Sequence, residues 1–233
     1  MNVSAILTDI EGTTTAIDFV HKVLFPYAAE NLPAFVRAHA HDAAVRAILH
    51  DTRAEMGEPG ADDEAVIARL LAWIAADRKI TPLKQLQGLI WESGYRQGHF
   101  RGHLYDDAYA NLKRWHASGI PLYIFSSGSV KAQKLLFGHT EHGDLTPWFS
   151  GYFDTTTGAK RDAEAYRAIA EAVDEPADEI LFLSDITEEL DAASEAGMQV
   201  CQLVRGAPPQ SRHPQVTNFD DIDILSDAKR VQR

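Results

Sequence analysis

The chain has 233 residues, of which 45% are hydrophobic and 24% are charged, a composition typical of a globular protein with a sizeable core. Its formal net charge of −12 argues against a nucleic acid or an anionic membrane as partner, because both require a basic surface. The single cysteine excludes an intrachain disulfide, and no apolar run approaches the roughly 20 residues that span a bilayer.

The first predicted element is a buried strand at Val3–Leu7, and a long segment of helical periodicity follows it. Residues 16–103 contain no convincing strand, and the clearest loop in them is Met56–Asp63, which is rich in Gly and Pro. Five helices are predicted there, at Asp18–Ala29, Leu32–His39, Ala43–Met56, Glu64–Ala76 and Pro82–Tyr95. A helical module therefore interrupts the chain after its first strand, where it could close a site and exclude water.

Three later apolar runs predict further buried strands, because strands covered on both faces are almost continuously apolar. These strands are predicted at Ile120–Phe125, Ile180–Leu183 and Val200–Val204. Helices are predicted between or beside them at Val130–Phe137, Ala163–Val173 and Glu188–Ala196. Strands that alternate with helices indicate an α/β fold with a doubly wound, Rossmann-like parallel sheet. We expect a core of residues 1–15 and 104–233, with residues 16–103 as an inserted helical cap.

In open parallel sheets, ligands bind beyond the carboxyl ends of the strands. Asp9 and Glu11 follow the first strand and run into a turn at Gly12. One carboxyl group there could attack phosphorus as a nucleophile, while the other protonates the leaving oxygen and then activates water. The glycine would let backbone N–H groups approach phosphate oxygens. The structural alternative is an Asx turn with a helix cap, which the same residues would also satisfy.

Polar residues follow the later strands as well. Ser126 and Ser127 could donate hydrogen bonds to a phosphate, or could cap the next helix. Lys160 could neutralise a transferring phosphoryl group or could be simply exposed, and Arg161 beside it leaves that choice open. Asp185 offers a hard oxygen to Mg²⁺, or another helix cap. Taken together, polar groups at successive strand ends favour a site for phosphoryl transfer.

At these positions the chain resembles the haloacid dehalogenase superfamily, whose four motifs occur in this order. The motifs resemble Asp9–Thr13, Ser126 after an apolar strand, Lys160, and Asp185 with its nearby acids. The second acidic residue of the first motif is usually Asp in that superfamily, whereas here it is Glu11. The longer segments Asp9–Thr15, Phe125–Gly138 and Phe153–Thr155 look like the enolase-phosphatases of the methionine salvage pathway.

This resemblance implies a phosphoric monoester hydrolase that is also an enolase. It would enolise 2,3-diketo-5-methylthiopentyl-1-phosphate and hydrolyse its phosphate through an aspartyl-phosphate, giving the acireductone. Asp9 and Glu11 would be catalytic, and together with Asp185 they would hold one Mg²⁺ per subunit. Glu11 could reach the metal by its carboxylate or by its main-chain oxygen. Three residues would bind the substrate, namely Ser126, Ser127 and Lys160. The partner would be a small-molecule phosphate ester, with neither nucleic acid nor membrane involved.

Three other functions remain open. A capped phosphatase for another small phosphate ester would use the same residues. The presence of Asp9, Glu11, Lys160 and Asp185 argues against a catalytically silent phosphate-binding module on this fold. A hydrolytic dehalogenase would not require Glu11 and Asp185. The enzyme classes differ in the product that is released, and the silent module would release none.

The remaining features predict surface residues and cellular location. The pairs His99/His103 and His139/His142 have spacings that a transition metal could use, but no further ligands accompany them, so surface histidines are expected. The acidic segment Asp220–Asp227 is expected to be a solvated loop or short helix. We expect no secretory signal, because the N-terminus lacks a basic segment followed by an apolar one. With the family resemblance, this predicts a cytoplasmic, mostly monomeric enzyme.

Overall fold

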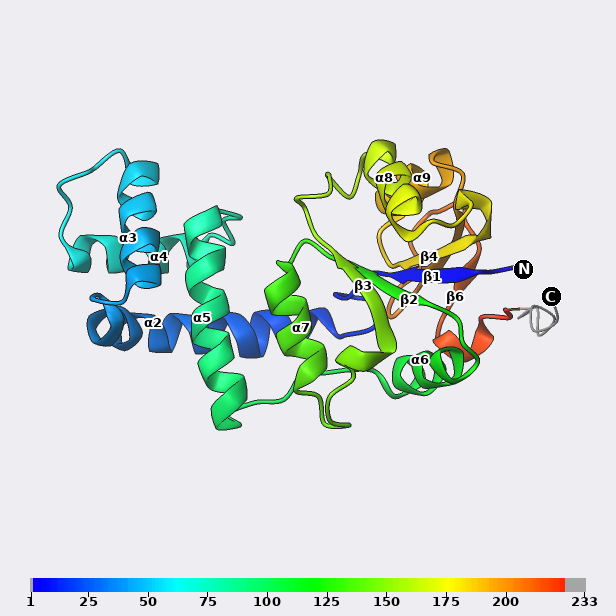
Figure 1. Cartoon of the computed structure of the whole chain (residues 1–233), viewed down its shortest axis with the longest axis horizontal. Helices are drawn as coiled ribbons and strands as arrows, with labels where there is room; N and C mark the ends of the chain where they lie inside the picture. Colours follow the sequence, from blue (N-terminus) through cyan, green and yellow to red (C-terminus); the bar gives the residue numbers. More distant parts are fainter. Residues whose placement is uncertain (1, 225–233) are drawn as a thin grey trace. The chain divides into compact units, whose positions relative to one another are not determined.

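The structure is a computed structural model that describes residues 2–224. The chain forms two compact units, the first from Met1–Ile17 with the chain from Gly102 onward, and the second from Asp18–Arg101. The first unit contains a parallel sheet with helices around it, and the second is helical (Figure 1). Each unit has a buried apolar core of its own.

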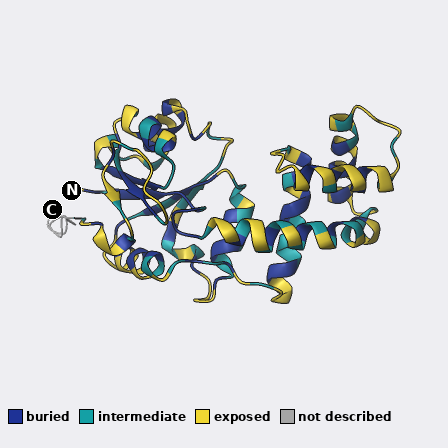
Figure 2. Ribbon diagram, turned by 180° about the vertical axis from the view of Figure 1, so that it is seen from behind, coloured by how far each residue is buried: buried dark blue, intermediate teal, exposed yellow. Residues whose placement is uncertain are grey.

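Within residues 2–224 the sheet has six strands, all of whose pairings are parallel, in the order β3-β2-β1-β4-β5-β6. The strands are β1 (Ala5–Thr8), β2 (Leu122–Phe125), β3 (Phe149–Phe153), β4 (Ile180–Ser184), β5 (Gln199–Leu203) and β6 (Gln215–Val216). Every residue of the central strands β1 and β4 is buried, and Figure 2 shows the sheet interior in dark blue. The four predicted strands are thereby confirmed, with shifts of one or two residues at their ends.

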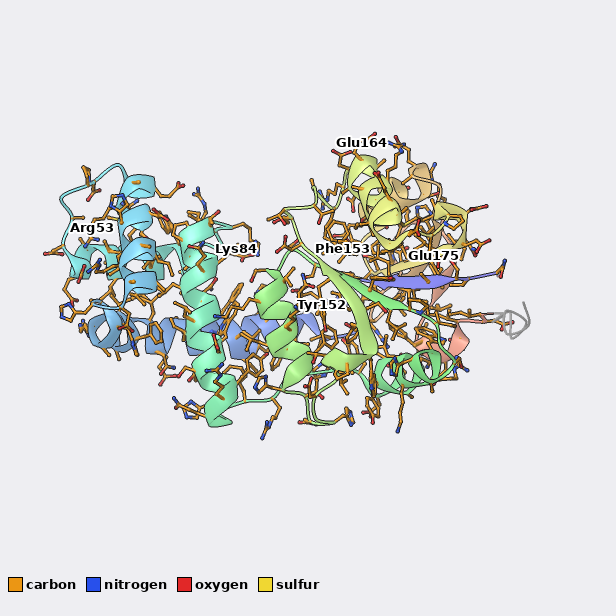
Figure 3. The ribbon with its side chains drawn as sticks, in the orientation of Figure 1. Arg53, Lys84, Tyr152, Phe153, Glu164 and Glu175 are labelled. Carbon is orange, nitrogen blue, oxygen red and sulfur yellow. The ribbon has the colours of Figure 1, made fainter. Side chains whose placement is uncertain are left out.

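The two outer strands, β3 and β6, were not predicted. In β3, Ser150 and Gly151 interrupt the apolar pattern, and most of the strand is only half-buried. Tyr152, labelled on β3 in Figure 3, instead lies beneath the ammonium of Lys134, 5.4 Å from the ring centroid. The strand β6 has two residues, too few to give any pattern.

Helices cover both faces of this sheet. They are α6 (Asp106–Ala117), α7 (Val130–Gly138), α8 (Ala163–Val173) and α9 (Thr187–Glu195), with short 3-10 turns η2 (Thr146–Trp148), η3 (Ala177–Glu179) and η4 (Phe219–Asp221). Figure 1 shows α8 and α9 on one face and α6 on the other. The helix α6 was not predicted, although its buried residues Ala108, Leu112 and Trp115 follow helical spacing.

The second unit is built from amphipathic helices around its own core. They are α1 (Ile17–Phe19), the π turn η1 (Val20–Leu24), α2 (Phe25–His39), α3 (Ala43–Met56), α4 (Asp63–Ala75) and α5 (Thr81–Gln97). The predicted break between residues 29 and 32 is wrong, because α2 runs through Pro33. A proline inside a helix costs about 3 kcal/mol. Leu32 and Val36 are fully buried, and their burial, at about 1.5–3 kcal/mol for each side chain, offsets a cost of this size.

The order of the strands reverses between β1 and β4, which makes the carboxyl ends of these two strands a topological switch point. From β1 the chain proceeds outward through β2 to β3, and then returns to β4 on the other side of β1. Ligands bind at such points, beyond the carboxyl ends of the strands. The N–H of Asp9 donates to the carbonyl of Leu183 at 2.8 Å, so the residues that follow β1 and β4 emerge as neighbours.

The structure also bears on the predicted lack of a membrane span and on the acidic segment near the C-terminus. No helix within residues 2–224 has both the length and the apolar character needed to cross a membrane. The predicted acidic segment Asp220–Asp227 is described only as far as residue 224. Its first part forms the turn η4, in which Asp220 accepts a hydrogen bond of 2.7 Å from the Asn111 amide. The residues from 225 onward lie outside the described structure.

Candidate active site

Lys160 lies between two acidic side chains at the carboxyl edge of the sheet. Its Nζ is 2.5 Å from Oδ1 of Asp9 and 2.7 Å from Oε2 of Glu189. The lysine side chain is 7% exposed, so the alternative of an ordinary surface lysine is wrong for Lys160, whereas Arg161 is exposed. Burial alone would lower the pKa of Lys160, but the charges of Asp9 and Glu189 outweigh burial and raise that pKa. The ammonium therefore stays charged at neutral pH.

The backbone at Lys160 is held in place by α8. The buried hydroxyl of Tyr166 donates to the carbonyl oxygen of Lys160 at 2.7 Å. Two residues before the lysine, Gly158 lies so close to α8 that an added Cβ would be 2.7 Å from Cβ of Ala165. A larger residue at position 158 would push this loop away from the helix. The site lysine thus depends on close packing between its loop and α8.

Glu11 lies in a different environment from Asp9, although only one residue separates them. Oγ of Ser126 donates to Oε2 of Glu11 at 3.1 Å. Burial, followed by the charge of Asp9, raises the pKa of Glu11, while Lys160 and Ser126 oppose this rise only in part. A carboxyl group with a raised pKa retains its proton nearer to neutral pH, as a general acid must.

The two serines after β2 do not cap the next helix. Ser129 is the N-cap of α7, and its side chain accepts a hydrogen bond from the N–H of Ala132 at 3.3 Å. Ser126 is fully buried, and its Oγ accepts from the N–H of Gly128 at 3.0 Å. Ser127 is exposed at the same turn. The capping alternative is therefore wrong for Ser126 and Ser127.

Asp185 is placed against the turn that carries Gly12 and Thr13. Its N–H donates to Oγ1 of Thr13 at 3.0 Å, and a Cβ added at Gly12 would lie 2.2 Å from its Oδ2. Gly12 also has a φ of +81°, which favours glycine for a second reason. The N-cap of α9 is Ile186, so the alternative that Asp185 caps this helix is wrong. Burial, followed by the charge of Asp9, raises the pKa of Asp185 to about 6.

One oxygen of this carboxyl group, Oδ1 of Asp185, is buried without a hydrogen-bond partner among the described residues. Leaving a buried polar atom unpaired is costly, and a bound cation would remove that cost. Carboxylate oxygens are the ligands that Mg²⁺ prefers. Within residues 2–224 no three His, Cys, Asp or Glu side chains are grouped so as to hold a metal ion. Two carboxylates, Asp9 and Asp185, nonetheless fit one hard cation whose other ligands are a main-chain oxygen, water or substrate.

Glu189 belongs to this site, although it was not predicted. Its Oε2 accepts from Oγ of Ser184 at 2.9 Å and forms the ion pair with Lys160. Burial, followed by the charge of Asp9, raises its pKa to about 7, and the lysine opposes this rise. The helical periodicity of α9 could have identified Glu189 from the sequence. Glu189 lies on the buried side of the helix with Leu190, while Glu188 is exposed.

Comparisons with known proteins give the following matches. Residues 3–197 match the model of the haloacid dehalogenase-like hydrolases. The chain is 61% identical to enolase-phosphatase E1 of Methylococcus capsulatus, over 94% of this chain and 97% of that protein. It is 58% identical to enolase-phosphatase E1 of Pseudomonas syringae pv. syringae, over 97% and 100%. The crystal structure of the UTR4 protein of Saccharomyces cerevisiae matches with a TM-score of 0.81 and 36% identity, over 95% of this chain and 100% of that chain.

Proposed function

The chain belongs to the haloacid dehalogenase-like hydrolases and, within them, to the enolase-phosphatases, and from this membership we propose its substrate and mechanism. The enzyme acts in methionine salvage on 2,3-diketo-5-methylthiopentyl-1-phosphate. It enolises the diketone and then hydrolyses the phosphate ester, which gives the acireductone 1,2-dihydroxy-3-keto-5-methylthiopentene.

The observation that supports this proposal best is the separation of two neighbouring acids into two environments. Asp9 forms an ion pair with Lys160, whereas Glu11 accepts a hydrogen bond from Ser126 and has a raised pKa. One carboxyl group paired with an ammonium and a second one with a raised pKa can divide the roles of nucleophile and proton donor. A phosphatase that works through an aspartyl-phosphate requires this division.

In the proposed reaction Asp9 attacks phosphorus, so an oxygen–phosphorus bond forms while the ester P–O bond breaks. Glu11 gives its proton to the leaving oxygen. Water then attacks the aspartyl-phosphate, Glu11 takes the proton of that water, and the carboxylate of Asp9 is released. Lys160 offsets negative charge on the transferring group, and Ser126 and Ser127 donate hydrogen bonds to it.

We propose that one Mg²⁺ per subunit is held by the carboxylates of Asp9 and Asp185 and by an oxygen of Glu11. The buried, unpartnered Oδ1 of Asp185 supports this assignment. So does the charge of this site, because Lys160 already pairs with both Asp9 and Glu189 and a bound phosphate would add further negative charge. The side chain of Glu11 is engaged by Ser126, which favours its main-chain oxygen as the ligand. When bound, Mg²⁺ would act as a Lewis acid toward phosphoryl and carbonyl oxygens.

The remaining expectations are part of the same proposal. Residues 16–103 act as the cap, inserted after the first strand of a core made from residues 1–15 and 104–233. The enzyme is cytoplasmic and monomeric, and its partner is the phosphate ester alone. These statements rest on the family resemblance, and size-exclusion chromatography with light scattering tests the monomeric state directly.

The proposed function is tested by supplying the diketone phosphate and Mg²⁺ to the purified protein. The ultraviolet absorbance of the conjugated enol and the release of phosphate are followed in the same sample. We expect the enol to form and phosphate to be released in equal amount. Phosphate release from other small esters but not from the diketone phosphate would support the alternative of a different capped phosphatase. Release from none of them would contradict any phosphatase assignment.

A further inference from the structure

Arg205 lies two residues after the end of β5, and its guanidinium group contacts an acidic side chain, two aromatic rings and a backbone carbonyl. Nη1 forms an ion pair of 2.8 Å with Oδ2 of Asp107, and both side chains are largely buried at 15% and 16% exposure. The guanidinium carbon Cζ also lies over two aromatic rings, 4.1 Å from the ring centroid of Tyr105 and 5.4 Å from that of Phe219. A rigid, planar group in such surroundings has little freedom to move.

The remaining donors of this arginine point at the catalytic turn. Nε and Nη2 of Arg205 both donate to the carbonyl oxygen of Thr13, at 3.2 and 3.0 Å. Thr13 is only four residues after Asp9 in the sequence, but 192 residues before the arginine. A guanidinium group that donates two hydrogen bonds to one carbonyl oxygen fixes both the distance of that carbonyl from the arginine and its orientation.

Thr13 in turn contacts the proposed metal ligand. Its Oγ1 accepts from the N–H of Asp185 at 3.0 Å, and the neighbouring Gly12 lies against the carboxylate of Asp185. The position of Thr13 therefore sets how near the first motif lies to Asp185. Any shift of the turn would alter the separation between the carboxylates of Asp9 and Asp185.

Gln202, a residue of β5, holds Asp185 from its other side. Nε2 of Gln202, on β5, donates to the carbonyl oxygen of Asp185 at 2.8 Å and to Oγ1 of Thr187 at 3.0 Å. The backbone of Asp185 is thus bound through its N–H by Thr13 and through its carbonyl by Gln202. Since Gln202 is fixed in β5, Arg205 supplies the link that fixes the opposite side.

We propose that Arg205 is a positioning residue for the metal site, which holds the Gly12–Thr13 turn at the distance from Asp185 that Mg²⁺ binding requires. This inference rests on the proposed function, because it takes Asp9 and Asp185 as the metal ligands. Arg205 acts through Thr13 and touches neither metal nor substrate. Residues that orient metal ligands typically contribute about tenfold to a hundredfold to metal affinity.

The test is to measure Mg²⁺ binding by calorimetry, without substrate, in the wild-type protein and in Arg205→Met. We expect the variant to bind Mg²⁺ about tenfold to a hundredfold more weakly. Arg205→Lys keeps a positive charge near Asp107 but cannot form the two-pronged contact with Thr13, so we expect a smaller loss. The matched control is Arg212→Met, which removes an exposed arginine of the same segment and should leave binding unchanged.

The thermal stability of each variant is measured alongside metal affinity. A lower melting temperature with wild-type affinity for Mg²⁺ would show that Arg205 is merely structural, and would overturn the inference. If Arg205→Met does not fold, Arg205→Lys decides, and wild-type affinity in that variant would again overturn it. Turnover of the diketone phosphate is a separate readout. Its absence from the wild-type protein would refute the proposed function, while the comparison of metal affinities would still decide the role of Arg205.

Discussion

The carboxylate of Glu189 lies 2.7 Å from Nζ of Lys160, which makes its other ion pair with the proposed nucleophile, Asp9. The ammonium is therefore shared between an acid on α9 and an acid after β1. How strongly it binds Asp9 depends on the charge of Glu189. A residue that was absent from the sequence prediction thus influences the reactivity of the nucleophile.

Replacing Glu189 with Gln should reduce phosphate release about tenfold to a hundredfold at saturating Mg²⁺. The variant keeps an oxygen acceptor but loses the charge, so the ammonium of Lys160 pairs more strongly with Asp9 and makes it less nucleophilic. Steady-state kinetics on the diketone phosphate provide the measurement. The exposed neighbour Glu188→Gln is the matched control and should retain the wild-type rate. A similar loss in both variants would mean that α9 itself, rather than the ion pair, is affected.

Glu189 should also make the metal-free protein less stable as the pH rises. Folding raises the pKa of this residue from 4.5 to about 7, mainly because of burial, so the folded protein binds the proton more tightly than the unfolded chain. Its contribution to stability is fully present below pH 4.5 and is lost as the pH rises through about 7. That contribution is at most ~3 kcal/mol.

Denaturant unfolding of the chelator-treated protein at pH 5 and pH 8 would measure this effect. We expect the free energy of unfolding of the wild-type protein to fall more across this range than that of Glu189→Gln, which cannot lose the proton. Parallel pH dependence in the two proteins would rule out the assignment of this ionisation to Glu189.

Glu11→Gln should lower the rate of phosphate release by about a hundredfold to ten-thousandfold, the usual contribution of a positioned proton donor. The loss should be much smaller with an ester such as a nitrophenyl phosphate, whose leaving oxygen requires no proton. Rates on the two kinds of ester are compared under the same conditions. Equal losses would assign Glu11 to metal binding or folding instead of proton transfer.

Gly12→Ala should abolish Mg²⁺-dependent phosphate release. The added Cβ would lie 2.2 Å from Oδ2 of Asp185, so the carboxylate would have to move. Gly57→Ala is the matched control, because its φ of +69° resembles the +81° of Gly12 and nothing lies within 4 Å of its added Cβ. Both variants should lose about 1–2 kcal/mol of stability from backbone strain. Only Gly12→Ala should lose activity, and equal activities in the two variants would contradict the clash.

Local sequence patterns predicted most of the sheet and of the candidate site, but they could not predict contacts between residues far apart in the sequence. The strands β1 and β4 are apolar up to their last residue because both of their faces are buried, and Asp9 and Asp185 follow them directly. The edge strand β3 is half-buried and lacks such a pattern. Arg205 could not be assigned from sequence, because its role depends on a contact with Thr13 across 192 residues.

The most direct test of the account is phosphate release by the variant Asp9→Asn, with bound metal quantified in the same preparation. An amide is a far poorer nucleophile than a carboxylate, so no aspartyl-phosphate can form in the variant. We predict that metal-loaded Asp9→Asn releases no phosphate from the diketone phosphate, even though enolisation, which requires no attack on phosphorus, can continue. Release of phosphate at the wild-type rate by metal-loaded Asp9→Asn would contradict the role of Asp9 as the nucleophile.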